Sequence, residues 1–87
     1  MLRLSGTNEE EGQLTILVEG RIISPWLEVL EAECRRELAT GFAITLDLVG
    51  VTYVGPAGVT LLRQLTGEGV RLANASGVVA EMLATSD

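Results

Sequence analysis

The sequence predicts an α/β fold, a two-layer sandwich in which a mainly parallel four-stranded sheet carries its helices on one face. Segments with alternating apolar residues, typical of strands, are interspersed with segments whose apolar residues recur at helical spacing. The resulting order, β-β-α-β-α-β-α, implies parallel strands joined by crossovers. The strands alternate instead of being apolar throughout, which leaves one sheet face polar. If the strands lie in chain order, crossovers of the same hand place every helix on the other face.

The amino-acid composition excludes several classes of function for this chain. The 87 residues form one domain, residues 1–87, and a hydrophobic content of 47% is sufficient for a packed core. The net charge is −6, and the chain has one tryptophan, one tyrosine and one phenylalanine, so it lacks the basic and aromatic surfaces of nucleic-acid-binding proteins. No apolar run approaches the roughly 20 residues that span a bilayer, and no signal peptide is recognisable. With Cys34 as its single cysteine, we expect a cytoplasmic protein without membrane insertion.

The N-terminal part predicts a hairpin. Residues Met1–Leu4 alternate weakly and predict an edge strand, and the polar segment Ser5–Gly12, with three consecutive glutamates, predicts a solvated loop. From Leu14 to Arg21 the apolar period is two, which predicts the second strand, antiparallel to the first.

The next segment predicts a helix. Ser24 is expected as its N-cap with Pro25 at the first helical position, and Gly41 as its left-handed end. Trp26, in the first turn, is interpreted as a core residue or hydrophobic staple, with an interface anchor as the alternative. Cys34 lies in the apolar stripe and is interpreted as a small buried hydrophobe. The stripe consists of Leu27, Leu30, Cys34 and Leu38.

A third strand over Phe42–Leu48 leads through a predicted loop to a second helix that begins at Gly55-Pro56 and ends at Gly67 or Gly69. Proline suits the first helical position because its missing N–H has no intrahelical acceptor there. The turn is expected to present free N–H groups and the positive end of a helix. It is either simply a well-built helix start or a partner-docking surface. Asp47 is expected to be a hydrogen-bonded carboxylate at the strand end.

The remaining elements are a fourth strand over Val70–Ala73, a turn over Asn74–Gly77 and a short helix over Val78–Ala84 with Ser76 as N-cap. Loops at the carboxyl ends of parallel strands are expected to gather at one edge of the sheet, where a binding site belongs. These loops are Gly20–Ser24, Val49–Gly58 and Asn74–Gly77. The polar sheet face is expected to carry Arg3, Thr15, Glu19, Thr45, Asp47 and Arg71.

The central segment Leu46–Val54, followed by Gly55-Pro56-Ala57-Gly58, resembles the central signature of the STAS domain, which is named for sulfate transporters and anti-sigma factor antagonists. Gly69–Ser76 with the short apolar helix after it, and Val18–Ile22, are similar to the flanking parts of the family. The resemblance covers nearly the whole chain. It implies a STAS-like fold and a role in binding a regulatory protein.

The chain departs from the family at the turn itself. In the phosphorylatable bacterial members the turn has the sequence Asp-Ser-Ser-Gly or Asp-Thr-Ala-Gly, and a partner kinase phosphorylates the residue after the aspartate. By position, Gly55 replaces the aspartate, Pro56 the phosphoacceptor and Ala57 the second hydroxyl residue, whereas Gly58 matches. Proline cannot be phosphorylated, so the resemblance implies that the usual switch is absent at this turn.

The combined expectation is a non-catalytic regulatory module that binds a protein partner, either an anti-sigma factor or a kinase-like relative of one. The alternatives are a small soluble subunit that binds the ATPase of a membrane-lipid ABC transporter, and a small-ligand or anion-binding domain. No catalytic residue, metal ligand set or cofactor is predicted, because the chain has neither histidine nor lysine. The fourth strand is expected to be an open edge at which a second copy could pair to form a homodimer. The candidate partner-binding residues are Ser24, Trp26, Tyr53, Gly55, Pro56, Ala57, Gly58 and Ser76.

Overall fold

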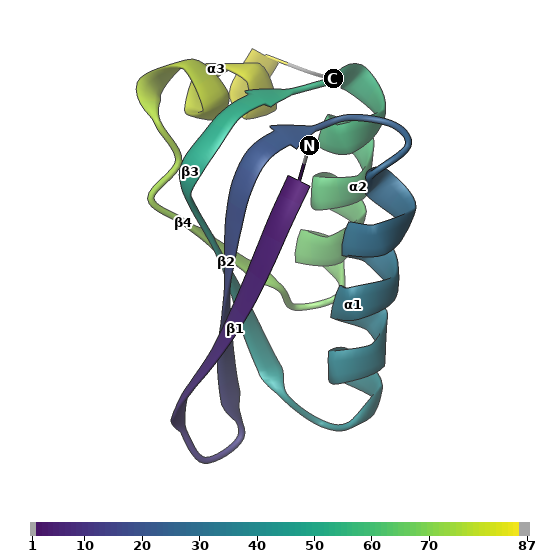
Figure 1. The fold of residues 1–87 in the computed structure, drawn as a ribbon, viewed down its shortest axis with the longest axis vertical. Coiled ribbons are helices and arrows are strands. Elements are labelled where there is room, and N and C mark those ends of the chain that lie inside the picture. Colours follow the sequence, from purple (N-terminus) through teal and green to yellow (C-terminus); the bar gives the residue numbers. More distant parts are fainter. Residues whose placement is uncertain (1, 86–87) are drawn as a thin grey trace.

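The computed structural model describes residues 2–85, which form four strands and three helices in the predicted order (Figure 1). None of the helices formed by these residues has the length and apolar character that crossing a bilayer requires. The elements are β1 (Leu2–Glu10), β2 (Gln13–Ile22), α1 (Leu27–Ala39), β3 (Ala43–Val54), α2 (Pro56–Gly67), β4 (Arg71–Ala73) and α3 (Gly77–Thr85).

The four strands lie in chain order, β1-β2-β3-β4. β1 is antiparallel to β2, whereas β2, β3 and β4 are parallel to one another. Figure 1 shows α1 and α2 side by side on one face of the sheet, and α3 at its upper end beside β3. Two crossovers of the same hand account for the placement of α1 and α2. The predicted fold class, a two-layer α/β sandwich, is therefore confirmed.

The core lies between the sheet and the helices. Among the side chains that the structure describes, those in the core are all apolar, and no charged or polar side chain is buried. The predicted apolar stripe of α1 is confirmed, since Leu30 and Cys34 are buried and Leu27 and Leu38 pack against the core. From α2, Val59, Leu61, Leu62 and Leu65 are buried. Fully buried side chains include Ile16, Val18 and Ile22 of β2, Ile44, Leu46 and Leu48 of β3, Leu30 and Cys34 of α1, Leu62 and Leu65 of α2, and Val79 of α3.

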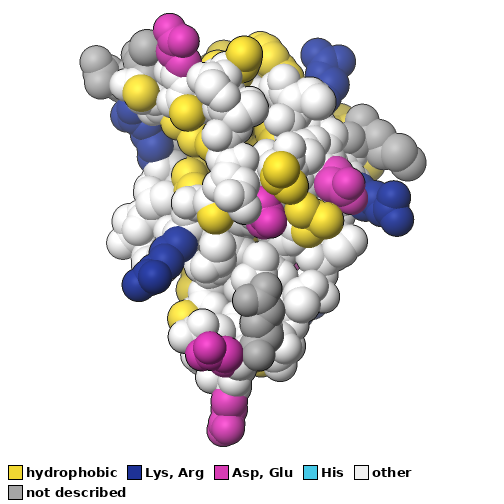
Figure 2. Space-filling model, turned by 90° about the vertical axis from the view of Figure 1, so that its left-hand side faces the viewer, with side chains coloured by type: hydrophobic (Ala, Val, Ile, Leu, Met, Phe, Trp, Pro, Cys, Tyr) yellow, Lys and Arg dark blue, Asp and Glu magenta, His cyan; other side chains and the backbone are white. Residues whose placement is uncertain are grey.

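The sheet face away from α1 and α2 is open, as predicted, and Figure 2 looks onto it. Most of the surface in this view is neither charged nor hydrophobic. Arg3 and Glu19 face each other here across the β1–β2 pair, with their charged groups 3.9 Å apart. A shallow depression of about 210 Å³ lies at the start of β3, lined in part by Thr15, Thr45 and Arg71.

The predicted end of the first strand at Leu4 is wrong. β1 continues through the polar segment to Glu10, and only Glu11 and Gly12 form the hairpin turn; Met1 lies outside the described residues. The reason is pairing, because Ser5 lies opposite Leu17 and Thr7 opposite Thr15. An edge strand needs no apolar alternation of its own once a neighbouring strand supplies the hydrogen bonds.

The predicted loop after Leu48 is also wrong, because β3 continues to Val54. Two irregularities in its pairing with β2 place one extra residue in β3 each time. The strand is buried at Leu48, Val51 and Val54, a spacing of three, and the intervening Val49 and Thr52 are exposed. Each β-bulge adds one residue to the strand and restores the orientation of the next core residue.

The start of α1 is a third correction. Ser24 does not cap this helix; Trp26 occupies the N-cap position and Leu27 is the first helical residue. The Ser24–Pro25 peptide bond is cis. The N–H of Trp26 donates a hydrogen bond to the carbonyl of Ile23 at 2.9 Å, which closes a separate turn before the helix. The predicted left-handed residue at the other end is confirmed, since Gly41 has φ +95°.

The β4 edge is short. β4 contains three residues, of which Arg71 pairs with Thr45 and Ala73 with Asp47. A short edge strand offers few unpaired backbone groups to another chain. Pairing with a second copy at this edge stays a prediction.

Candidate functional site

The Gly55–Gly58 turn joins the end of β3 to the start of α2. Gly55 is the N-cap, with φ −75° and ψ 168°, and Pro56 occupies the first helical position as predicted. Pro56 and Ala57 are exposed, whereas Gly55 and Gly58 are buried. The two central residues of the turn are therefore accessible to another molecule, and the two glycines belong to the interior.

Fewer backbone donors are free at this turn than the sequence suggests. The N–H of Gly55 donates to the carbonyl of Ile22 at 3.0 Å, and the carbonyl of Gly55 accepts from Val59 at 2.9 Å. The helical pattern leaves the N–H groups of Ala57 and Gly58 without an intrahelical acceptor. No described side chain caps α2, and its first turn holds no acidic residue, so the positive end of the helix is not neutralised locally.

Gly58 has a structural role in the close approach of α2 to β2. A Cβ atom at this position would lie 2.7 Å from the carbonyl oxygen of Ile22, 2.9 Å from its Cγ2 and 3.0 Å from Cγ1 of Val54. These distances are too short for any side chain. Gly58 is therefore needed for packing, and its burial removes it from the accessible surface of the turn.

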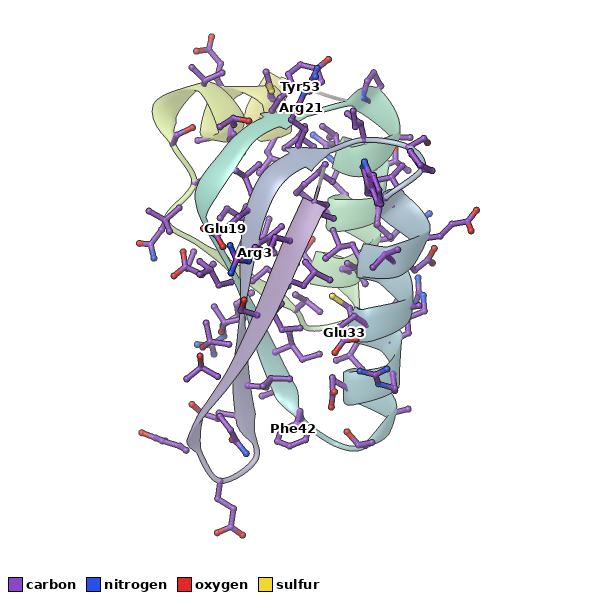
Figure 3. The ribbon with its side chains drawn as sticks, viewed as in Figure 1. Arg3, Glu19, Arg21, Glu33, Phe42 and Tyr53 are labelled. Carbon is purple, nitrogen blue, oxygen red and sulfur yellow. The ribbon has the colours of Figure 1, made fainter. Side chains whose placement is uncertain are left out.

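Tyr53 lies next to this turn together with Arg21, a residue that the sequence interpretation treated only as the end of a strand. The two residues pair across β2 and β3, and the Arg21 guanidinium carbon lies 5.4 Å from the centre of the Tyr53 ring. Figure 3 shows them side by side at the upper end of the sheet. The pairing depends on the second bulge of β3, so no local sequence pattern could reveal it.

Ser24 and Trp26 also lie close to the turn. They follow Ile23, whose Cγ2 would be 3.2 Å from a Cβ atom at Gly55. Ser24 is exposed, and Trp26 is partly buried at the N-cap of α1. The segment between β2 and α1 therefore packs beside the turn between β3 and α2 at Ile23.

Ser76 lies at the start of α3. Its hydroxyl accepts a hydrogen bond from the N–H of Val79 at 3.2 Å, which confirms it as the N-cap of α3. The preceding strand, β4, ends beside Asp47, seven residues before the end of β3 at Val54. Seven strand residues span roughly 20 Å. β3 therefore extends past the end of β4, and the meeting of this loop with the other two at one edge stays a prediction.

Neither of the two titratable groups considered from the sequence has a reactive setting. Cys34 is fully buried, and burial raises the pKa of its thiol to about 11, so it is protonated at neutral pH. Asp47 accepts hydrogen bonds through Oδ1 from the N–H of Val49 at 3.0 Å and from Nδ2 of Asn74 at 3.1 Å. It lies within β3 and not at its end. Residues 2–85 contain no group of three or more His, Cys, Asp or Glu side chains arranged to hold a metal ion.

Comparison with known proteins gives a clear result for structure only. No family model matches the sequence, and no curated protein matches it. Three similar solved structures are all anti-sigma factor antagonists. One, from Mycobacterium paratuberculosis, has a TM-score of 0.80 at 18% identity, over 94% of this chain and 74% of that chain. SpoIIAA in its unphosphorylated form has a TM-score of 0.75 at 13% identity, over 94% and 82%.

The third structure is a STAS domain from Rhodobacter sphaeroides, with a TM-score of 0.67 at 15% identity, over 90% of this chain and 95% of that chain. The match covers nearly all of this chain and most of each solved structure. This structural match is consistent with the element order, the strand order and the side of the sheet on which α1 and α2 lie. The chain therefore has the fold of the STAS domains of anti-sigma factor antagonists.

Proposed function

We propose that this chain is a non-catalytic regulatory module that binds a protein partner through the surface around Pro56 and Ala57. It resembles an anti-sigma factor antagonist that cannot be phosphorylated at the usual turn. The partner is an anti-sigma factor or a kinase-like relative, and the protein acts in the cytoplasm.

The observation that carries this proposal is the exposure of Pro56 and Ala57 at the start of α2 on a STAS fold. The resemblance in sequence places the phosphoacceptor of the family at Pro56. A proline at the first helical position is compatible with the helix start but has no hydroxyl group. Both observations support the proposal of a docking surface that lacks the usual chemical switch.

The non-catalytic part of the proposal is supported by the setting of the side chains. The one thiol is buried and protonated, and the carboxylate of Asp47 is held by two hydrogen bonds. General acid–base or nucleophilic catalysis needs an accessible group whose pKa suits its role.

Affinity capture from the native lysate tests the docking surface. We expect the wild-type chain to retain a protein that the Ala57→Arg variant does not, because the new side chain projects from the exposed centre of the turn. Ala32→Arg is the matched control, since Ala32 is exposed on α1 away from this turn. Equal capture by wild type and Ala57→Arg would contradict docking at the turn.

The identity of the captured protein decides between the partner classes. A histidine-kinase-like anti-sigma factor supports the proposal, and the ATPase subunit of a transporter supports the alternative. If the partner is a kinase, incubation with ATP followed by mass spectrometry should leave residues 49–58 of the wild type unmodified. A phosphate within this segment would exclude the loss of the switch.

A further inference from the structure

Arg21 is one of three arginines, among the six of this acidic chain, that form no ion pair with a described carboxylate. Arg3, Arg35 and Arg36 each form ion pairs with glutamates, and Arg63 donates a hydrogen bond to the carbonyl of Leu83. Among the side chains that the structure describes, none forms an ion pair with Arg21 or with Arg71. Arg21 is exposed, so its charge is accessible to another molecule.

Arg21 lies in contact with the ring of Tyr53. The guanidinium lies over the ring at 5.4 Å, a cation–π geometry that restricts the arginine without neutralising it. The bulge at Thr52 brings the two side chains together, and the Thr52 hydroxyl donates to the Gly20 carbonyl at 3.3 Å, which ties this part of β3 to β2. Tyr53 is itself 37% exposed, so an aromatic surface lies beside the charge.

A second source of positive potential adjoins this pair. A Cβ atom at Gly55 would lie 3.8 Å from Cε2 of Tyr53, which places the ring against the start of α2. That helix has no acidic residue in its first turn. In a chain of net charge −6, the surface formed by Arg21, Tyr53 and Ala57 therefore combines positive potential with exposed apolar area.

We propose that this surface binds an acidic segment of the protein partner, in which a carboxylate lies against Arg21 and an apolar side chain packs on Tyr53. The inference rests on the proposed function and adds the chemistry of the partner. Charge complementarity favours a carboxylate-bearing segment, and the exposed ring next to the charge favours a protein chain over a free anion.

An NMR titration of the isotope-labelled chain tests this proposal. The probe is a synthetic peptide of repeated Glu-Leu-Ser triplets, and the control peptide carries glutamine in place of glutamate. We expect the amide signals of Arg21, Tyr53 and Ala57 to shift with the acidic peptide, and not with the control. Raising the salt concentration should weaken the binding, because the charge contact is exposed to solvent.

Two variants with the same change in net charge complete the test. Arg21→Gln should weaken peptide binding about tenfold, whereas Arg71→Gln should leave it unchanged, since Arg71 pairs with Thr45 at the opposite end of β3. Both side chains are exposed, so both variants should fold. An equal loss in the two variants, shifts centred on Arg71, or no shifts at millimolar peptide would overturn the proposal.

Two further results would also overturn it. Inorganic phosphate alone could produce the same shifts, which would indicate an anion site, or the shifts could depend on protein concentration without peptide, which would indicate a second copy. The outcome is separable from that of the lysate capture. Ala57→Arg can abolish capture of the partner while the peptide fails to bind, in which case the docking surface stands and its acidic preference does not.

Discussion

Gly58 shows how a residue shared with a family motif can have a packing role. The match to the STAS signature placed it among the candidate partner-binding residues, but the structure buries it where α2 crosses the end of β2. The exposed positions of the same turn are Pro56 and Ala57. A large substitution at Gly58 would disturb the fold before it disturbed any interface, so it cannot report on partner binding.

Substitution of Gly58 by alanine should therefore destabilise the protein by roughly 1–3 kcal/mol, the usual range for overpacking a tight contact. The added methyl group would meet the backbone oxygen of Ile22, which cannot move without disturbing the hydrogen bond that it accepts from Gly55. Urea unfolding followed by circular dichroism measures the change.

Gly67→Ala is the matched control in the same helix. Nothing lies within 4 Å of a Cβ atom at Gly67, and the substitution should stabilise the helix by at most about 1 kcal/mol. Equal stability of the Gly58→Ala variant and the wild type would show that α2 can shift away from β2 at little cost.

At the scale of elements, β3 explains what the sequence could and could not predict. Its first half alternates regularly and was predicted, and the proline at the start of α2 identified that helix correctly. Its second half is buried at every third residue because of two bulges, a spacing that does not match the period of two of a regular strand. The bulges depend on pairing with β2, about thirty residues away in sequence, so local periodicity could not reveal them.

The prediction of the candidate site from sequence is limited in the same way, because some of its features depend on strand pairing. The Gly55–Gly58 turn was predicted from local chemistry, because proline and glycine have strong local preferences. The contact between Arg21 and Tyr53 was not, since it requires the register of two strands and the bulge between them. The extension of β3 past β4 was missed for a related reason, because the relative lengths of the two strands are set by pairing.

Asp47 links two of these elements, and its removal should show what holds the first bulge in place. Its Oδ1 atom accepts hydrogen bonds from the N–H of Val49, across the bulge, and from Asn74, just after β4. Asp47→Ala should cost about 1 kcal/mol in the free energy of unfolding, because both donors lose their partner in a partly exposed site. Urea unfolding and the hydrogen-exchange rate of the Val49 amide measure the effect.

Asp47→Asn is the control for this prediction, since an amide oxygen can accept the same two hydrogen bonds. It should retain most of the stability and slow exchange at Val49. If the alanine variant also exchanges as slowly as wild type at Val49, the carboxylate does not stabilise the bulge.

At the scale of the whole molecule, the distribution of charge affects the stability of the fold, because charged groups on all elements interact with one another. The chain carries 12 acidic and 6 basic residues, and its longest dimension is 33 Å. Exposed glutamates lie at the hairpin turn, where Glu10 and Glu11 have no basic neighbour in sequence, and at Glu28 in the first turn of α1. The short ion pairs on α1, such as Arg35–Glu31 at 2.9 Å, balance only part of this charge.

Salt should therefore stabilise the protein, by an amount on the order of a few tenths of a kcal/mol for each like-charge contact relieved. At about 10 mM ionic strength the screening length is about 30 Å, comparable to the whole molecule, so every acidic group repels every other. At about 150 mM it falls to about 8 Å, which removes the long-range repulsion while the ion pairs of α1, in direct contact, are weakened less.

Urea, an uncharged denaturant, is the appropriate probe, and the unfolding midpoint should rise between these salt concentrations. A variant with Glu10→Gln and Glu11→Gln should show a smaller rise, because it carries less charge to screen. A midpoint that falls with salt would mean that the ion pairs of α1, and not the net charge of −6, dominate the electrostatic free energy of the fold.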